Sequence, residues 1–171
     1  MDIIELILAD HDRQRRGFAL LDEAQGADAD AETVQAIWDG LAVLLDAHAD
    51  AEEALFYPRL LDIGKEGDEE TEDAIGDHND IRDAVRAAGT HRVGSKVWWS
   101  CVADARVANS DHMGEEERGA LADFRRRAPL ELRRQLGLEF AAFEASRAGG
   151  HHIDRSDKDP DTYIEEHKQH S

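Results

Sequence analysis

Four histidines and two glutamates are spaced along this chain in a pattern that suits metal binding. Two of the histidines are followed four residues later by a glutamate, and residues four apart lie on the same face of an α-helix. Each pair can therefore direct an imidazole nitrogen and a carboxylate oxygen at one point, and both groups are common metal ligands. The candidate ligands are His11, His48 with Glu52, His78, and His112 with Glu116.

The distances of these residues from the expected turns decide whether they can meet. If the helices are antiparallel neighbours joined by short loops, His11 and His48 lie 15 and 17 residues from the first turn, at about the same height. Glu52 and His78 lie 12 and 10 residues from the second turn, so their heights match as well. His78 and His112 lie 11 and 17 residues from the third turn, an overhang of about 9 Å at helical rise. The third connection or a longer fourth helix must absorb this difference.

Apolar residues recur at helical spacing through most of the chain, which predicts an all-α fold. Pro58 should kink or end the second helix, and Gly89 is a natural stop for a short, polar third helix. Pro129 should open a fifth helix that packs on the other four. The expected helices are about 3–26, 31–64 with the interruption at Pro58, 68–89, 95–127 and 129–147.

We expect residues 1–148 to form one domain, with a metal-binding core over 3–128 and the fifth helix over 129–147. From Gly149 onward the sequence is polar and rich in Gly and Asp, which predicts a mobile tail over 149–171. Four histidines of this tail could bind metal adventitiously, although a solvated tail is the favoured interpretation. They are His151, His152, His167 and His170.

Composition narrows the class of protein. A chain of 171 residues, 41% of them hydrophobic, can bury the core of one domain. Its 39 acidic and 20 basic residues give a net charge of −19, which repels nucleic acids and anionic membranes, so neither is an expected partner. No apolar run reaches the roughly 20 residues needed to span a bilayer, and the first residues lack the order of a signal peptide, so we expect a cytoplasmic protein. A single cysteine, Cys101, excludes an intrachain disulfide and is expected to be a core thiol.

Residues 3–128 resemble the hemerythrin-like family, also called the HHE cation-binding domain. The resemblance lies in the order of the candidate ligands and in three local sequences: HDRQRR at His11, HADAEEALFYP at His48 and HMGEEERGAL at His112. It implies an up-down antiparallel four-helix bundle that holds two iron ions in one diiron centre. It also implies that the histidines are terminal ligands and that the two glutamates, Glu52 and Glu116, bridge the metals.

Two departures from the oxygen-carrying members of that family narrow the expected function. Those members place a second histidine one turn after the third-helix ligand, where this chain has Arg82, and they end with a differently spaced carboxylate, where this chain has Glu116. The departures favour the ligand set of bacterial hemerythrin-like proteins over that of reversible oxygen carriers. Arg82 itself should point to solvent or guard the entrance of the cavity.

The types of the candidate ligands do not fix which metal binds, or which roles the residues next to the ligands have. Imidazole with carboxylate suits Fe, Mn, Zn or Cu, and bundle cores with paired carboxylates commonly hold two octahedral metals. Two bridging glutamates and four histidines fill eight of their twelve positions, which leaves four for oxo, hydroxo, water or O2. Glu53, Glu115 and Glu117 could replace a ligand if the helical phase shifts, although surface groups or partners of the histidines are the commoner roles. Tyr57 could hydrogen-bond near the metals, although a tyrosine at the core edge is the favoured interpretation.

The predicted function is that of a non-haem diiron protein that reacts with small oxidants, namely O2, hydrogen peroxide or nitric oxide, in oxidative or nitrosative stress. An enzyme of this kind would use open iron positions for Lewis-acid and redox chemistry, with a redox partner that the sequence does not identify. No catalytic acid or base stands out beyond the metal ligands. The alternatives are a reversible oxygen-binding or sensing protein and a metal-storage bundle.

Overall fold

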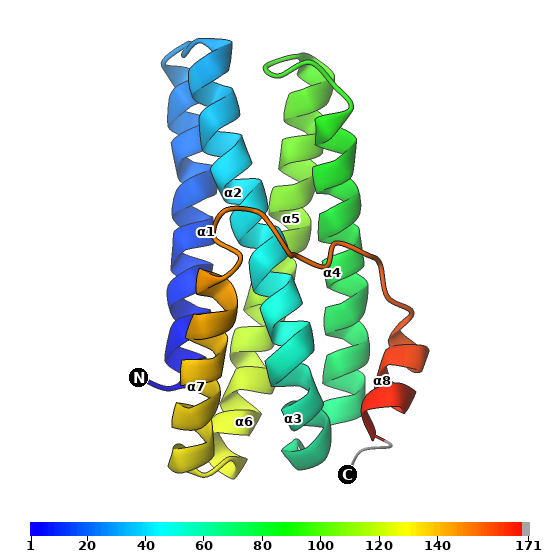
Figure 1. Cartoon of the computed structure of the whole chain (residues 1–171). Coiled ribbons are helices and arrows are strands. Elements are labelled where there is room, and N and C mark those ends of the chain that lie inside the picture. Colours follow the sequence, from blue (N-terminus) through cyan, green and yellow to red (C-terminus); the bar gives the residue numbers. More distant parts are fainter. Residues whose placement is uncertain (169–171) are drawn as a thin grey trace.

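Four long antiparallel helices form the body of the protein in the computed structural model, which describes residues 1–168. Two of them pack as one hairpin and two as another, and the hairpins lie side by side (Figure 1). No strand occurs among the described residues, so the predicted all-α helical bundle is confirmed. The four helices are α1 (Ile3–Gly26), α2 (Ala31–Ala51), α4 (Gly67–Gly89) and α5 (Lys96–Arg118).

Side-chain caps fix where three of these helices begin. The Asp2 carboxylate accepts hydrogen bonds from the backbone N–H groups of Ile4 and Glu5, and the Glu5 carboxylate accepts one from the N–H of Asp2. Asp30 caps α2 and Ser95 caps α5 in the same way. These caps satisfy N–H groups that lack a partner within the helix. The helix starts are therefore set by residues remote from the histidines, and they fix the heights at which the histidines lie.

The second long helix is interrupted next to the candidate ligands. It leaves α-helical geometry after Ala51, continues as the π-helix η1 (Glu52–Phe56) and becomes α3 (Tyr57–Ile63). Pro58 stands at the start of α3, where it has no N–H to donate and would clash with a carbonyl in a regular α-helix. A π turn is wider and is often found at functional sites. The interruption predicted at Pro58 thus takes the form of a π turn that contains Glu52.

The fourth helix, expected to be continuous over 95–127, is two helices. α5 ends at Arg118, and α6 (Ala120–Arg127) begins after Gly119. A Cβ atom on Gly119 would lie 2.9 Å from Glu70 Oε1 and 3.2 Å from the backbone oxygen of Glu115, so a side chain here would displace the Glu70 carboxylate and crowd the end of α5. From sequence alone, a lone glycine in a helical pattern is also compatible with an unbroken helix.

The hydrophobic core consists of two clusters with a polar layer between them. Along the chain, the candidate ligands of each long helix lie between residues of one cluster and residues of the other, which for α5 are residues of α6. Apolar packing above and below therefore holds the polar layer in place. Cys101 is a buried thiol in the upper cluster. That cluster includes Phe18, Trp38, Leu45 and Trp98, and the lower cluster includes Ile7, Phe56, Leu60, Phe124 and Phe140.

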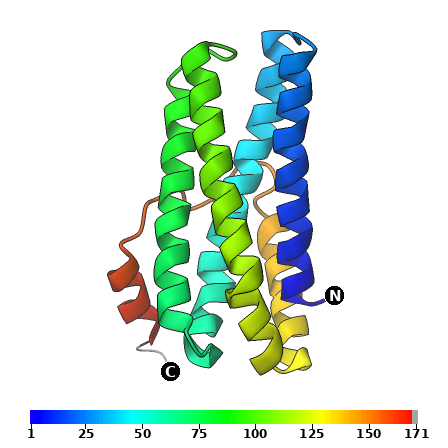
Figure 2. The same ribbon diagram turned by 180° about the vertical axis from the view of Figure 1, so that it is seen from behind.

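Two further segments cover the bundle. α7 (Leu130–Ala145) packs on α1 and α2, in the place of the fifth helix expected over 129–147. Residues 149–159 then cross from α7 over α2 to α4, and α8 (Pro160–Lys168) lies beside α4 (Figures 1 and 2). The mobile tail expected over 149–171 is thus replaced, as far as residue 168, by a defined path and a helix. Its charged residues find partners on α2 and α4, which composition alone does not reveal. His170 lies outside the described residues.

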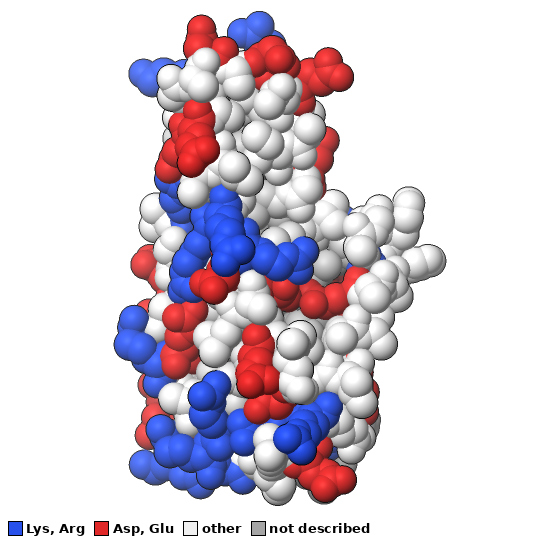
Figure 3. Space-filling view, turned by 90° about the vertical axis from the view of Figure 1, so that its left-hand side faces the viewer, with Lys and Arg blue, Asp and Glu red and all other residues white. Residues whose placement is uncertain are grey.

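The negative net charge is not spread evenly over the surface. Figure 3 shows Lys and Arg in two groups on one face, one near mid-height and one at the lower end, where α6 and α7 meet, with Asp and Glu between them. The last turn of α6 contributes three of them, Arg125, Arg126 and Arg127. Over residues 1–168, the helices are all too short or too polar to cross a membrane.

Candidate metal centre

The six predicted ligands converge on one buried point from all four long helices. α1 supplies His11, α2 supplies His48, η1 supplies Glu52, α4 supplies His78, and α5 supplies both His112 and Glu116. Each of the six is at most 5% exposed. The structure thus brings together every residue that the spacing singled out, and the 9 Å overhang expected for His112 does not keep it from the others.

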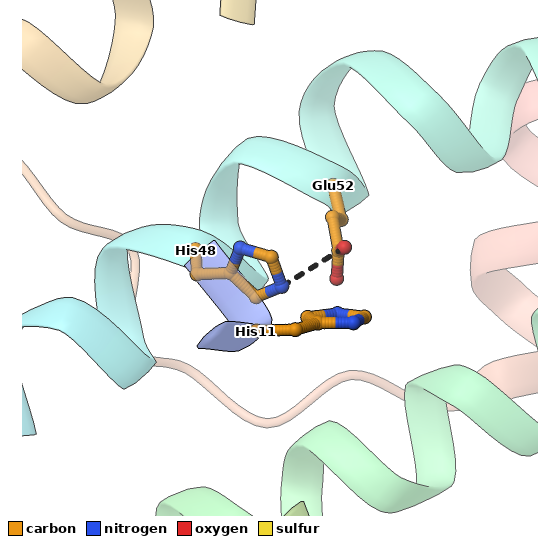
Figure 4. Close-up of side chains that lie close together, drawn as sticks. All are labelled: His11, His48 and Glu52. Carbon is orange, nitrogen blue, oxygen red and sulfur yellow. Dashed lines mark ion pairs between the residues drawn. The ribbon is translucent and has the colours of Figure 1, made fainter. Parts of the chain in front are cut away.

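Two of the histidines approach the glutamates from the first hairpin. The Nε2 atom of His48 lies 3.0 Å from Glu52 Oε1, and the Nε2 atom of His11 lies 3.3 Å from Glu116 Oε2. Figure 4 shows His11 and His48 directed toward Glu52. Ligand atoms of His11, His48 and Glu52 all lie within 4.8 Å of one another, a separation at which one metal ion can contact all three. We call His11 and His48 the first half-site.

The other two histidines approach the same glutamate from the second hairpin. Glu52 Oε2 lies 3.3 Å from His78 Nε2 and 3.8 Å from His112 Nε2, and ligand atoms of these three residues also lie within 4.8 Å of one another. We call His78 and His112 the second half-site. Glu52 turns one oxygen toward each half-site. That is the geometry a carboxylate needs to bridge two metals.

Four buried atoms at this point form no hydrogen bond of good geometry. They are His11 Nε2, His48 Nε2, Glu52 Oε1 and Glu116 Oε2, and they face one another in two pairs, His48 with Glu52 at 3.0 Å and His11 with Glu116 at 3.3 Å. Protein interiors rarely leave a buried polar atom without a hydrogen bond, because that costs free energy. A metal cation could accept an electron pair from each of the four. The donor set and its geometry therefore suit the cation that these residue types predict.

Carboxylates outside this point hold all four histidines by their other ring nitrogen. The Nδ1 atoms of His11 and His78 lie 2.9 and 2.8 Å from Glu117 and Glu53, and those of His48 and His112 lie 3.4 Å from Asp10 and Asp77. A carboxylate there fixes the ring orientation and the tautomer with Nε2 free for a metal.

The four carboxylates follow one rule. Each adjoins a predicted ligand in the sequence, yet each contacts the histidine of a neighbouring helix. The contacts therefore run in a closed circle around the bundle. Glu53 and Glu117 were candidates for such a role from sequence. Asp10 and Asp77 were missed, although an acidic residue next to a ligand is the signal that could have found them.

The carboxylates give the site a negative electrostatic character. Burial alone lowers the pKa of His112, but the hydrogen bond to Asp77 and the charges of Glu52 and Glu116 outweigh it and raise that pKa to about 10. The pKa of His48 is likewise raised well above its usual range, because Glu52 and Asp10 outweigh the effect of burial. Both shifts mean that the site favours positive charge. A bound metal cation meets the same demand.

Glu144 of α7 contacts Asp10, the carboxylate behind His48. Burial and the hydrogen bond to Asp10 raise the pKa of Glu144 to about 8, whereas the pKa of Asp10 falls to about 2, because its hydrogen bonds to His48 and Glu144 outweigh burial. The two carboxyl groups thus share one proton near neutral pH. Ligand atoms of Asp10, His48 and Glu144 also lie within 4.8 Å of one another. Since His48 already directs Nε2 at Glu52, we interpret the acid pair as its support.

Tyr57 lies at the centre of the site rather than at the edge of the core, where the sequence placed it. Its side chain is fully buried, and its hydroxyl lies 2.9 Å from Glu116 Oε1 and 3.3 Å from Glu52 Oε2. Burial and the charges of Glu116 and Glu52 raise the pKa of Tyr57, so the hydroxyl stays protonated and donates. One tyrosine therefore orients both glutamates.

Arg82 does not point to solvent. It is 2% exposed, and its Nη2 atom donates a hydrogen bond of 2.8 Å to Glu53 Oε1, the same oxygen that His78 contacts. Its guanidinium thus supports the carboxylate behind His78. Glu115 is exposed, in agreement with its alternative role as a surface group, and it lines a cavity.

A small cavity of about 60 Å³ borders the second half-site. It is lined by His112 and Glu116 on its inner side and by acidic residues of α4 and α5 on its outer side. A water molecule needs only about 10–15 Å³ of such space, so the cavity holds a few molecules of that size. The acidic lining residues are Glu70, Asp73, Asp77 and Glu115.

These observations define a class of protein: a helical bundle with a buried cluster of histidines and carboxylates that could hold a metal cation. Residues 2–123 match the family model described as hemerythrin HHE cation binding domain. The match covers most of the chain, so the protein belongs to the hemerythrin HHE cation-binding family, as the resemblance predicted. A search of curated proteins and a search of solved structures found no match. The second half of α6, together with α7, α8 and the segment that links them, lies beyond the matched region.

Proposed function

We propose that the chain binds two iron ions, one at each half-site, and that Glu52 and Glu116 bridge them. The observation that carries this proposal is the double orientation of the histidines. All four direct Nε2 at the carboxylate of Glu52 or of Glu116, and all four contact another carboxylate through Nδ1. Such support is typical of metal-bound histidine and less so of histidines that only fill a core.

We further propose that the centre reacts with small oxidants, namely O2, hydrogen peroxide or nitric oxide. Bound iron would supply Lewis-acid and redox chemistry. Six protein ligands would leave coordination positions of two octahedral metals open to an oxidant. Arg82 would not occupy one of them, because its guanidinium is bound to Glu53. The cavity at His112 admits molecules of the right size and excludes large organic substrates.

The residues around the centre favour turnover over storage. A storage bundle has no need of a cavity beside its ligands, whereas this one ends at His112 and Glu116. Tyr57 is the one hydroxyl donor that contacts both glutamates among the described residues, and it can hold a proton at Glu116 Oε1. The acidic lining of the cavity favours neutral oxidants over anionic ones.

Metal analysis and optical spectra of protein purified from iron-supplied cells test the proposal. We expect two irons per chain and catalytic consumption of added hydrogen peroxide. Zinc in place of iron, or one metal per chain, would contradict the diiron assignment. Reversible uptake of O2 over many cycles without peroxide consumption would favour the alternative of an oxygen carrier or sensor.

A further inference from the structure

The segment after α7 makes specific contacts with buried acidic residues of the bundle. Arg155 Nε lies 2.6 Å from Asp46 Oδ2, and the backbone N–H of Asp154 donates to Asp50 Oδ2 at 3.1 Å. The backbone of Lys158 forms two hydrogen bonds with the side chain of Asn79, one in each direction, at 2.7 and 3.0 Å. Contacts of this number and kind fix the position of the segment along α2 and α4. We call residues 149–168 the C-terminal clasp.

The clasp reaches Glu53 from two directions. Lys158 Nζ lies 2.6 Å from Glu53 Oε2, and the hydroxyl of Tyr163 donates a hydrogen bond to the backbone oxygen of Glu53. Tyr163 is 5% exposed, so α8 inserts this ring into the bundle. Both the side chain and the backbone of one residue are therefore held by the clasp.

Glu53 divides its two oxygens between the metal centre and the clasp. Oε1 accepts from His78 Nδ1 and from Arg82 Nη2, both at 2.8 Å, while Oε2 faces Lys158. Without Lys158 the second oxygen would be buried with no partner, which is costly. The carboxylate would then rotate toward Arg82 or toward water, and the Nδ1 bond that orients His78 would lengthen.

We propose that the C-terminal clasp positions His78 for metal binding, with Lys158 and Tyr163 acting through Glu53. This inference rests on the proposed metal centre. It assigns a role at the second half-site to residues that lie beyond the matched family region of 2–123. The first half-site receives no contact of this kind from the clasp among the described residues, so the clasp distinguishes the two half-sites. Lys158 and Tyr163 are positioning residues.

The test compares Lys158→Met with Lys158→Arg and with a matched control, Lys168→Met. Lys168 belongs to the same clasp and, like Lys158, pairs with a carboxylate. Its partner is Asp68 of α4, and this ion pair lies on the surface. Co²⁺ serves as the probe metal in anaerobic titrations. We expect Lys158→Met to weaken one of two binding steps by about 10–100-fold, the usual cost of removing support behind a ligand, and to leave the other step unchanged. Lys158→Arg should restore the affinity, and Lys168→Met should behave as wild type.

A second measurement uses metal-free protein labelled with ¹⁵N in histidine. Lys158→Met and Tyr163→Phe should both move the Nδ1 resonance of His78 and leave that of His11 in place. Tyr163→Phe removes only a hydroxyl, so this variant can still test the proposal if Lys158→Met folds poorly. Unchanged titrations and an unchanged His78 resonance would overturn the proposal. If wild-type protein binds no Co²⁺ at all, the proposed metal centre fails, and the His78 resonance still decides whether the clasp positions that residue.

Discussion

The two half-sites have the same ligand types but different surroundings. The first, on α1 and α2, is backed by Asp10, which shares a proton with Glu144 of α7. The second, on α4 and α5, is backed by Glu53, whose charge is balanced by Arg82 and by Lys158 of the clasp. Each half-site is thus completed by a different segment from beyond the matched family region.

Access differs as well. The cavity that approaches the centre is lined by His112 of the second half-site and by Glu116, while the edge of the Phe140 ring packs against His48 of the first. Two half-sites with the same donor types are therefore not equivalent. We expect the second half-site to exchange metal and react with oxidants, and the first to hold its metal more firmly.

Loss of the shared bridge should have the largest effect, because Glu52 belongs to both half-sites. Glu52→Ala should weaken metal binding at both by more than about 100-fold, beyond the 10–100-fold typical of changes behind a ligand. Metal content after dialysis measures it. The control is the double change of His151 and His152 to Ala, because both are exposed residues at the start of the clasp. Wild-type metal content in Glu52→Ala would mean that the half-sites are independent or absent.

Metal removal should lower the stability of the whole bundle, since the centre joins both hairpins and metal binds only the folded state. Saturation at 100 times Kd contributes about 2.7 kcal/mol. For a domain of this size that corresponds to a melting temperature about 5–10 °C lower after chelation. Thermal unfolding followed by circular dichroism checks it. An unchanged melting temperature would show that the six residues hold no metal in the folded protein.

Changes behind the histidines should separate the half-sites. Glu53→Gln should weaken only the second by about 10–100-fold, because it removes the charge that orients His78 and balances Arg82. Glu117→Gln should weaken only the first, and by less, because the Glu117 side chain is 29% exposed and water can replace part of its contact with His11. Stepwise metal titration distinguishes the two. Equal losses at both steps in either variant would show that the half-sites are not separable.

Tyr57→Phe should have the smallest effect on metal content. It removes one hydroxyl that donates to Glu116 and contacts Glu52. The net contribution of a typical hydrogen bond is about 0.5–1.5 kcal/mol, and a bound metal would share the carboxylate charge, so we expect a loss of no more than about 10-fold. Metal binding should weaken at both steps together, since the hydroxyl serves neither half-site alone. A variant that loses one metal and keeps the other would assign Tyr57 to a single half-site.

Most of the helices and the six candidate ligands could be predicted from the sequence. Helical spacing placed His48 and Glu52 on one face, as it did His112 and Glu116, and the turn positions put the histidines at compatible heights. These are local properties, since 3.6 residues per turn and 1.5 Å per residue hold wherever a helix forms. Glycine and proline marked several helix ends because of their own backbone preferences, which are also local. The break at Gly119 was missed because a lone glycine also occurs within continuous helices.

The partners that hold the candidate ligands in place became visible only in the folded structure. Which carboxylate contacts which histidine depends on how neighbouring helices are rotated about their axes, and sequence spacing does not fix that rotation. Arg82 and Tyr57 are polar enough for the surface, yet both are buried because Glu53, Glu116 and Glu52 offer them partners. The clasp has the composition of a solvated tail. Its path exists because Asp46, Asp50 and Glu53, far away in the sequence, are buried acids that need its cations and N–H donors.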